Sequence, residues 1–107
     1  MSKTLREFED SEFNDLIKSK KNAIIEFGAP WCNACKLTEP IIANLEESYQ
    51  NVLFGKIDVA KAPGLASKMG VMSLPNIFII KAGKIADQII GVTNKKTLEE
   101  KIKKLKC

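Results

Sequence analysis

The chain contains no histidine and only three cysteines, so it is poor in the side chains that bind transition metals. Cys32 and Cys35 form the single C-x-x-C pair of the sequence, and Cys107 is the last residue. A tetrahedral zinc site or an iron–sulfur cluster takes about four Cys or His ligands. One chain therefore offers too few ligands, and a metal site would require two copies of the chain to share their pairs.

Long hydrophobic runs are also absent, and so is any segment that marks the chain for export. No apolar stretch approaches the ~20 residues of a membrane-spanning helix. The first residues, "MSKTLREFEDSEF", are charged and contain neither the apolar stretch nor the cleavage site of a signal peptide. We therefore expect a cytoplasmic protein without a membrane partner.

The sequence has no internal repeat, no low-complexity tract and no linker, which predicts a single domain over residues 1–107. A chain of 107 residues is long enough to bury a core without covalent staples. A disulfide in this protein is therefore expected to carry out chemistry and not to hold the fold together.

The formal net charge is +4, from 17 Lys and Arg against 13 Asp and Glu. Much of the excess lies in the last segment, "NKKTLEEKIKKLKC". Lysine mixed with glutamate at helical spacing is typical of a solvated helix face, whereas a nucleic-acid site is a basic patch. We therefore predict no nucleic-acid partner.

Hydrophobic spacing predicts an α/β fold. Short apolar runs bounded by turn residues predict strands, and apolar residues at i, i+3 and i+4 predict helices. We expect strands over residues 22–29 and 51–59, two strands around Ala82-Gly83, and a short edge strand near 4–8. Helices are expected over 10–19, 33–49 with a kink at Pro40, within 62–70, and from 94 onwards. The right-handed crossover rule makes strands 22–29 and 51–59 parallel, with helices on both faces of the sheet.

The two neighbouring cysteines lie where the first long strand passes into a helix. In a reducing compartment a C-x-x-C pair is usually catalytic or metal-binding. The N-terminus of a helix has unpaired N–H groups and a positive dipole end, which help the thiol of Cys32 to lose its proton. Cys35 lies almost one turn further on the same face, so it can resolve a mixed disulfide formed by Cys32. A structural disulfide is a poor alternative, because so short a loop gains little from closure.

Four stretches in this order resemble the thioredoxins: "IIEFGAPWCNACKLTEPII", "KIDVAKAPGLASKMGV", "SLPNIFIIKAGK" and "IIGVTNKKTLEEKI". The resemblance extends from about residue 3 to the C-terminus. The joint pattern of W-C-x-x-C-K, a following Glu-Pro and a later Leu-Pro before an apolar strand is highly specific. It implies the thioredoxin fold, a central mixed sheet of about five strands, the first of them short, flanked by four helices.

The resemblance also implies roles for the residues of the redox centre. Cys32 matches the nucleophile and Cys35 the resolving cysteine. Glu26 matches the buried acid, usually Asp, that acts as a proton shuttle for the resolving cysteine, and Lys56 matches the lysine that accompanies this acid. Burial on an apolar strand independently predicts a raised pKa for Glu26, although a buried ion pair between Glu26 and Lys56 is an alternative.

A second group of residues matches the substrate-binding surface of the thioredoxins. Trp31 matches the indole that flanks the disulfide and contacts partners, although a partly buried aromatic beside a loop is an alternative. Pro75 matches the cis-proline packed against the cysteines, and the backbone of Leu74 matches the segment that pairs with an extended substrate. Gly91 matches a glycine that borders the substrate groove, or it simply ends a strand.

The sequence departs from the thioredoxin pattern at two places beside the cysteines. Asn33-Ala34 replaces the usual Gly-Pro between them, which frees a backbone N–H and changes the environment of the thiolate. Gly28 occupies a position that is often tryptophan, so there is less apolar cover near the site. Neither change removes a reacting group, and the redox potential is the property most affected.

The resemblance predicts a protein-disulfide reductase that contributes to electron transport and to the redox balance of the cell. The only redox centre would be the Cys32–Cys35 dithiol, with no bound cofactor. Thioredoxin reductase, a flavoprotein, would supply the electrons, disulfide-containing proteins would be the clients, and the chain would act as a monomer. Two alternatives stay open, namely a thiol oxidase or isomerase on the same fold and a non-catalytic interaction module. Cys107 either forms an intermolecular bridge or is a terminal thiol without a role.

Overall fold

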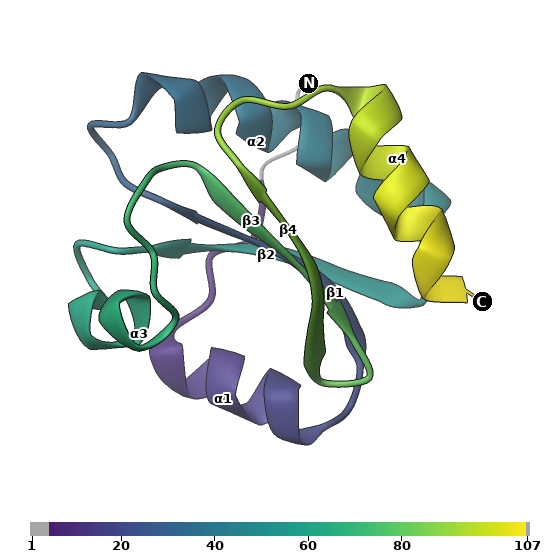
Figure 1. The fold of residues 1–107 in the computed structure, drawn as a ribbon, viewed down its shortest axis with the longest axis horizontal. Coiled ribbons are helices and arrows are strands. Elements are labelled where there is room, and N and C mark those ends of the chain that lie inside the picture. The colour runs from purple at the N-terminus through teal and green to yellow at the C-terminus, as the bar shows by residue number, and fades with distance from the viewer. Residues whose placement is uncertain (1–4, 107) are drawn as a thin grey trace.

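The structure, a computed structural model, describes residues 5–106, and within them helices flank a four-stranded sheet (Figure 1). The helices are α1 (Asp10–Lys18), α2 (Asn33–Leu45), α3 (Pro63–Lys68) and α4 (Lys95–Lys103). The strands are β1 (Asn22–Gly28), β2 (Val52–Asp58), β3 (Asn76–Lys81) and β4 (Lys84–Ile90). Short 3-10 turns, Glu46–Ser48 and Lys104–Lys106, follow α2 and α4. Each helix and long strand expected from hydrophobic spacing is present.

The strands lie in the order β2-β1-β3-β4, so β1 is an inner strand. It runs parallel to β2, as the crossover rule predicts, and antiparallel to β3. The register pairs Phe27 of β1 with Asn76 at the start of β3, and Asn76 with Ile90 at the end of β4. The C-terminal ends of β1 and β4 and the N-terminal end of β3 therefore meet at one end of the sheet.

The expected fifth strand near residues 4–8 is not formed by the residues that the structure describes. Only Glu7 makes an isolated parallel bridge to Lys56 of β2. Phe8 N–H donates to the Lys56 carbonyl at 2.7 Å, and Lys56 N–H donates to the Arg6 carbonyl at 2.8 Å. The chain then turns at once into α1, which leaves no length for a strand, and Thr4 lies outside the described residues.

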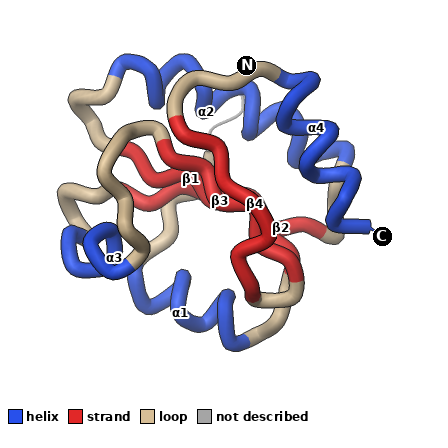
Figure 2. The backbone as a smooth tube through the Cα atoms, in the orientation of Figure 1, coloured by secondary structure: helices blue, strands red, loops and turns tan. Residues whose placement is uncertain are grey.

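Helices cover both faces of the sheet, with α2 and α4 on one face and α1 and α3 on the other (Figure 2). Ile24 of β1 packs into the core under α2 and α4, whereas Ile25 and Phe27 pack into the core under α1 and α3. Burial on both faces explains why β1 is a nearly continuous apolar run instead of an alternating one. Glu26 is the only ionisable residue within this run.

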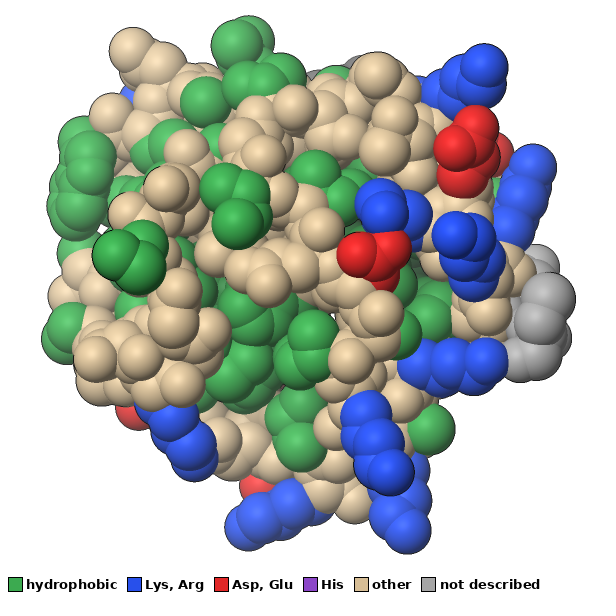
Figure 3. Space-filling model, in the orientation of Figure 1, with side chains coloured by type: hydrophobic (Ala, Val, Ile, Leu, Met, Phe, Trp, Pro, Cys, Tyr) green, Lys and Arg blue, Asp and Glu red, His purple; other side chains and the backbone are tan. Residues whose placement is uncertain are grey.

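Side-chain capping fixes where two of the helices begin. A capping box joins Glu9 and Glu12 at the start of α1, and Asn94 accepts a hydrogen bond from the Thr97 N–H at 2.9 Å at the start of α4. Leu98, Ile102 and Leu105 are buried, as their helical spacing predicts. Figure 3 shows lysine side chains over the region of α4 with acidic side chains among them, which agrees with a mixed, solvated helix face.

The β3–β4 hairpin turns through Ala82 and Gly83, whose φ values are +52° and +79°. A Cβ atom on Gly83 would lie 2.3 Å from the backbone oxygen of Ile17, so this glycine also allows the turn to approach the end of α1. We predict that Gly83→Ala lowers the free energy of unfolding by about 2–4 kcal/mol, because the clash adds to the strain of a positive φ.

Gly70→Ala is the matched control, since Gly70 has a φ of +72° but open space around its missing Cβ. It should cost only about 1 kcal/mol, the strain alone. Urea unfolding measures the free energy of unfolding of both variants. Equal losses in the two variants would show that the close approach to Ile17 does not affect stability.

Candidate functional site

The two cysteines lie at the end of β1, where the chain leaves the sheet and enters α2. Cys32 is the N-cap residue of α2, and its sulfur accepts a hydrogen bond from the Cys35 N–H at 3.1 Å. The two residues form a disulfide with a Cα–Cα distance of 5.3 Å. Cys32 is half-buried, while Cys35 is fully buried behind it. An incoming sulfur can therefore reach Cys32 more readily than Cys35.

The residues that flank the cysteines have simple structural positions. Asn33 is exposed at the start of α2, and the Ala34 carbonyl accepts a hydrogen bond from the Thr38 hydroxyl at 2.9 Å. The helix continues through Pro40 to Leu45. Trp31 is 68% exposed, so the alternative of a partly buried aromatic is wrong. Its indole is available at the surface next to the half-buried sulfur.

Glu26 is fully buried within β1, six residues before Cys32. Neither of its carboxyl oxygens has a hydrogen-bonding donor among the residues that the structure describes. Burial, and the neighbouring Glu39 carboxyl, raise the pKa of Glu26 to about 9, although the charge of Lys56 opposes this shift. At neutral pH the buried carboxyl therefore holds a proton.

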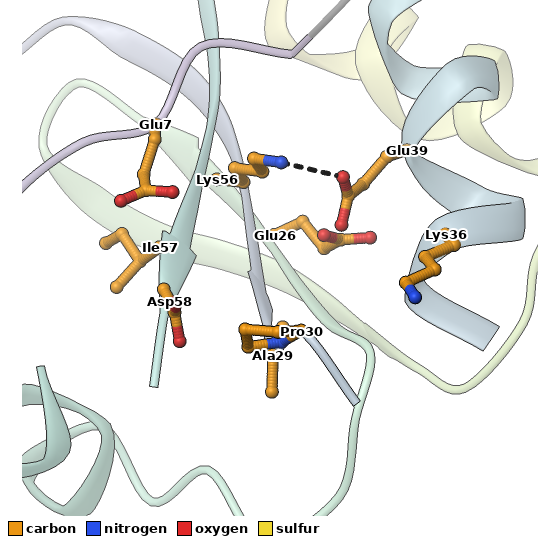
Figure 4. Close-up of a pocket in the computed structure, with 10 residues that line it drawn as sticks. Glu7, Glu26, Ala29, Pro30, Lys36, Glu39, Lys56, Ile57 and Asp58 are labelled. Atoms are coloured by element: carbon orange, nitrogen blue, oxygen red, sulfur yellow. Dashed lines mark hydrogen bonds and ion pairs between the residues drawn. The ribbon is translucent and has the colours of Figure 1, made fainter. Parts of the chain in front are cut away.

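Lys56 lies across from Glu26 in the β1–β2 register, as expected for a companion of the acid. Its Nζ, however, bonds to Glu39 Oε1 of α2 at 2.9 Å (Figure 4). The buried ion pair between Glu26 and Lys56 that the sequence suggested as an alternative is therefore not formed. Glu39 is half-buried and Glu26 fully buried, so the ion pair forms at the carboxyl where less charge has to leave water.

Gly28 leaves the space that joins the acid to the buried cysteine. A Cβ atom on Gly28 would lie 3.1 Å from Cys35 Sγ and 3.1 Å from Glu26 Oε1. Cys35 Sγ and Glu26 Oε1 both lie 3.1 Å from this point, so the distance between the two atoms is at most twice 3.1 Å. Because position 28 carries no side chain, no atom of that residue stands between the glutamate side chain and the cysteine.

A cavity of about 230 Å³ opens beside these residues, lined by Glu26, Gly28, Lys36, Glu39 and Lys56 among others (Figure 4). In this view the Glu26 carboxyl points toward the side chains of Glu39 and Lys36. The cavity therefore borders the side chain of the buried acid.

The residues predicted to bind substrate lie at the same end of the sheet as the cysteines. The Leu74–Pro75 peptide bond is cis, and the Gly91 N–H donates to the Pro75 carbonyl at 2.8 Å. Gly91 has a φ of +93° directly after β4. The loops at this end and the last residue of β4 carry apolar side chains of 62–95% exposure, namely Trp31, Met72, Val92 and, on β4, Ile90.

Glu39 is the site residue that the sequence analysis did not single out. It lies four residues after Cys35, which places both side chains on one face of α2. A charged residue at that spacing from a buried cysteine was the available signal. Cys107 lies outside the described residues, and within 5–106 no three His, Cys, Asp or Glu side chains gather as metal ligands. None of the described helices is long and apolar enough to cross a bilayer.

The burial of Glu26 predicts that stability falls as the pH rises. Its pKa is raised from 4.5 to about 9 on folding, so between these values the folded chain keeps a proton that the unfolded chain has released. The free energy of unfolding then falls by up to about 1.4 kcal/mol per pH unit. Glu26→Gln removes this titration, so the variant should gain stability over the wild type as the pH rises from about 5 to about 8.

Urea unfolding of the oxidised wild type and of Glu26→Gln at both pH values measures this effect. The same stability difference at both values would contradict the raised pKa.

Comparison with known proteins places this geometry in a family. The Thioredoxin family model matches residues 4–104. Thioredoxin of Staphylococcus saprophyticus is 38% identical over 98 residues, which are 89% of this chain and 91% of the relative. Mitochondrial thioredoxin 3 of Saccharomyces cerevisiae, in its oxidised form, superposes with a TM-score of 0.84 and 34% identity over 94% of each chain.

A third solved structure concerns the thiol-resolving mechanism of yeast mitochondrial 1-Cys peroxiredoxin through glutathione and thioredoxin systems; its chain has a TM-score of 0.83 and 33% identity over 94% of each chain. These likenesses confirm the thioredoxin fold, with four strands and four helices, and a redox-active disulfide that resides in the protein itself. The chain therefore belongs to the thioredoxin family.

Proposed function

We propose that this chain reduces disulfides of cytoplasmic proteins through a mixed disulfide between Cys32 and the client. Thioredoxins are thiol–disulfide oxidoreductases, and the chain is one of them. The observation that carries the finer proposal is the unequal exposure of the bridged cysteines. Cys32 is half-buried at the start of α2, whereas Cys35 is fully buried behind it. This arrangement suits one sulfur for attack and the other for resolution.

The reaction proceeds in two exchanges. The Cys32 thiolate attacks one sulfur of the client disulfide, and the other client sulfur leaves as a thiolate that takes a proton from water. Cys35 then attacks Cys32 Sγ, which releases the second client thiolate. The proton of Cys35 passes to this thiolate through the Glu26 carboxyl, which accepts a proton on one oxygen and gives up its own from the other. Two electrons have passed to the client, and the protein carries the Cys32–Cys35 disulfide.

Client binding is assigned to the end of the sheet beside the cysteines. An extended client segment would pair with the backbone of Leu74 next to Pro75, as in strand addition. Gly91 and the exposed Trp31 would border this segment. Main-chain pairing needs little from client side chains, which suits a reductant of many proteins.

The partners follow from the reaction. Thioredoxins receive electrons from thioredoxin reductase, and we propose a flavoprotein of this kind as the donor. A peroxiredoxin is one class of client to test, because a similar chain belongs to a structure study of peroxiredoxin resolution. We further propose that the chain works as a monomer. Its cytoplasmic location stays a prediction, favoured because a reducing compartment keeps a C-x-x-C pair cycling.

Three cysteine variants separate the proposed roles. With insulin as the disulfide client and dithiothreitol as the electron source, Cys32→Ala should remove the catalysed reduction. Cys35→Ala should also stop turnover, but it should accumulate a mixed disulfide through Cys32, because attack still occurs and resolution does not. Mass spectrometry after acid quenching detects the adduct.

Cys107→Ala is the matched control and should reduce insulin at the wild-type rate, within about twofold, because the reaction needs only the other two cysteines. A mixed disulfide through Cys35 in the Cys32→Ala variant, or full activity of that variant, would contradict the assigned roles.

A further inference from the structure

We propose that Glu39 is a positioning residue that holds Lys56 away from Glu26, so that Glu26 stays a protonated acid for the leaving sulfur of Cys35. This inference rests on the proposed function, and it concerns the step in which the Cys32–Cys35 disulfide is opened by an incoming thiolate. Glu39 acts through Lys56 and Glu26.

Lys56 forms its ion pair with Glu39 and not with Glu26. It faces Glu26 in the β1–β2 register, yet its Nζ bonds to Glu39 Oε1 at 2.9 Å. Glu26 is fully buried, and its two oxygens have no donor among residues 5–106. A buried carboxyl without a cation or donor keeps its proton, because the charged form would lack solvation.

The Glu26 carboxyl lies on the side of β1 where the sulfur of Cys35 is found. Gly28 leaves open a point that lies 3.1 Å from both Glu26 Oε1 and Cys35 Sγ. Cys35 is fully buried, so a thiolate formed there has no water around it. A neighbouring acid that supplies a proton removes this penalty, whereas an ionised Glu26 would repel the new thiolate.

The charged groups around Glu26 agree with this arrangement. The cavity beside it is lined by Lys36 and Glu39 of α2, Lys56 and Asp58 of β2, and Glu7 of the N-terminal segment. Glu7 pairs with Lys61, and Asp58 accepts the Ala60 N–H, so both carboxylates are engaged elsewhere. Burial and Glu39 raise the pKa of Glu26 to about 9, and Lys56 lowers it.

A donor thiolate attacks Cys32 Sγ and forms a mixed disulfide with it, while the Cys32–Cys35 bond breaks. Its electron pair leaves with Cys35, and the resulting thiolate takes the proton of Glu26. Glu26 becomes a carboxylate and regains a proton from solvent through the cavity. A second donor thiol then releases Cys32.

The two partners of the ion pair make a sharp test, because they should shift the reaction in opposite directions. Reduction of the disulfide by dithiothreitol is followed through Trp31 fluorescence from about pH 5 to about pH 10, and the rate is divided by the thiolate concentration. The rate per thiolate should fall as Glu26 ionises. Glu39→Gln should move this midpoint to lower pH by about one unit or more, because Lys56 is freed for Glu26 and a like charge is removed.

Lys56→Gln should move the midpoint to higher pH, and Lys56→Arg should keep it near the wild-type value. Glu100→Gln is the matched control, since it removes one exposed carboxylate on α4, and it should leave the profile unchanged. All variants are made with Cys107→Ala. When Glu39→Gln and Lys56→Gln are each combined with Glu26→Gln, their opposite shifts of the pH midpoint should disappear. This control separates an effect that acts through Glu26 from a direct effect of either charge on Cys35.

Equal or absent shifts in Glu39→Gln and Lys56→Gln would overturn the inference and leave an ordinary ion pair. Opposite shifts that persist in the Glu26→Gln background would also overturn it. If Glu39→Gln does not fold, carbon-13 NMR of the Glu26 carboxyl in the wild type decides, and titration near the usual value of a carboxyl overturns the inference. If dithiothreitol cannot reduce the Cys32–Cys35 disulfide of the wild type, the proposed function itself is refuted. The other outcomes named above overturn only the role of Glu39 and leave the proposed function intact.

Discussion

The packing of β1 is the constraint on which the rest of the site depends. This strand is hydrogen-bonded to β2 on one edge and to β3 on the other, and helices cover both of its faces. Its end is therefore held firmly, and the cysteines follow it after a short turn at the start of α2. The same packing desolvates Glu26, because the side chain of this residue is fully buried in the folded chain. The packing of β1 thus holds the two cysteines in place and favours the protonated form of Glu26.

The local features of the fold were predictable because they depend on neighbours in the sequence. The apolar run of 22–28, the helix that begins after Cys32 and the hairpin at Ala82-Gly83 follow from periodicity and turn chemistry. The first strand was overestimated, because among the described residues before α1 only Glu7 makes a bridge to the sheet. Whether a short extended segment pairs is decided by the sheet edge it meets, and local sequence does not contain that information.

The candidate site was predictable in its members but not in its pairings. Cys32 and Cys35 follow from their spacing, and burial of Glu26 follows from its strand. The choice of Lys56 between two carboxyls depends on their relative burial, which arises only when α2 packs on the sheet. Gly28 was expected to thin the cover of the site. The structure adds that the missing side chain leaves open a point 3.1 Å from both Glu26 Oε1 and Cys35 Sγ. The glycine at position 28 and the glutamate at position 26 therefore have to be considered together, because the first leaves space beside the side chain of the second.

The most direct test of this account is a redox titration of the chain in thiol–disulfide buffers, followed by the fluorescence of its single tryptophan, Trp31. The account predicts a reversible two-electron transition at a strongly reducing potential, which is lost when Cys35 is replaced by alanine. A transition at an oxidising potential would make the chain a thiol oxidase or isomerase instead of a reductase. The absence of any reversible transition would contradict the redox function of the Cys32–Cys35 pair.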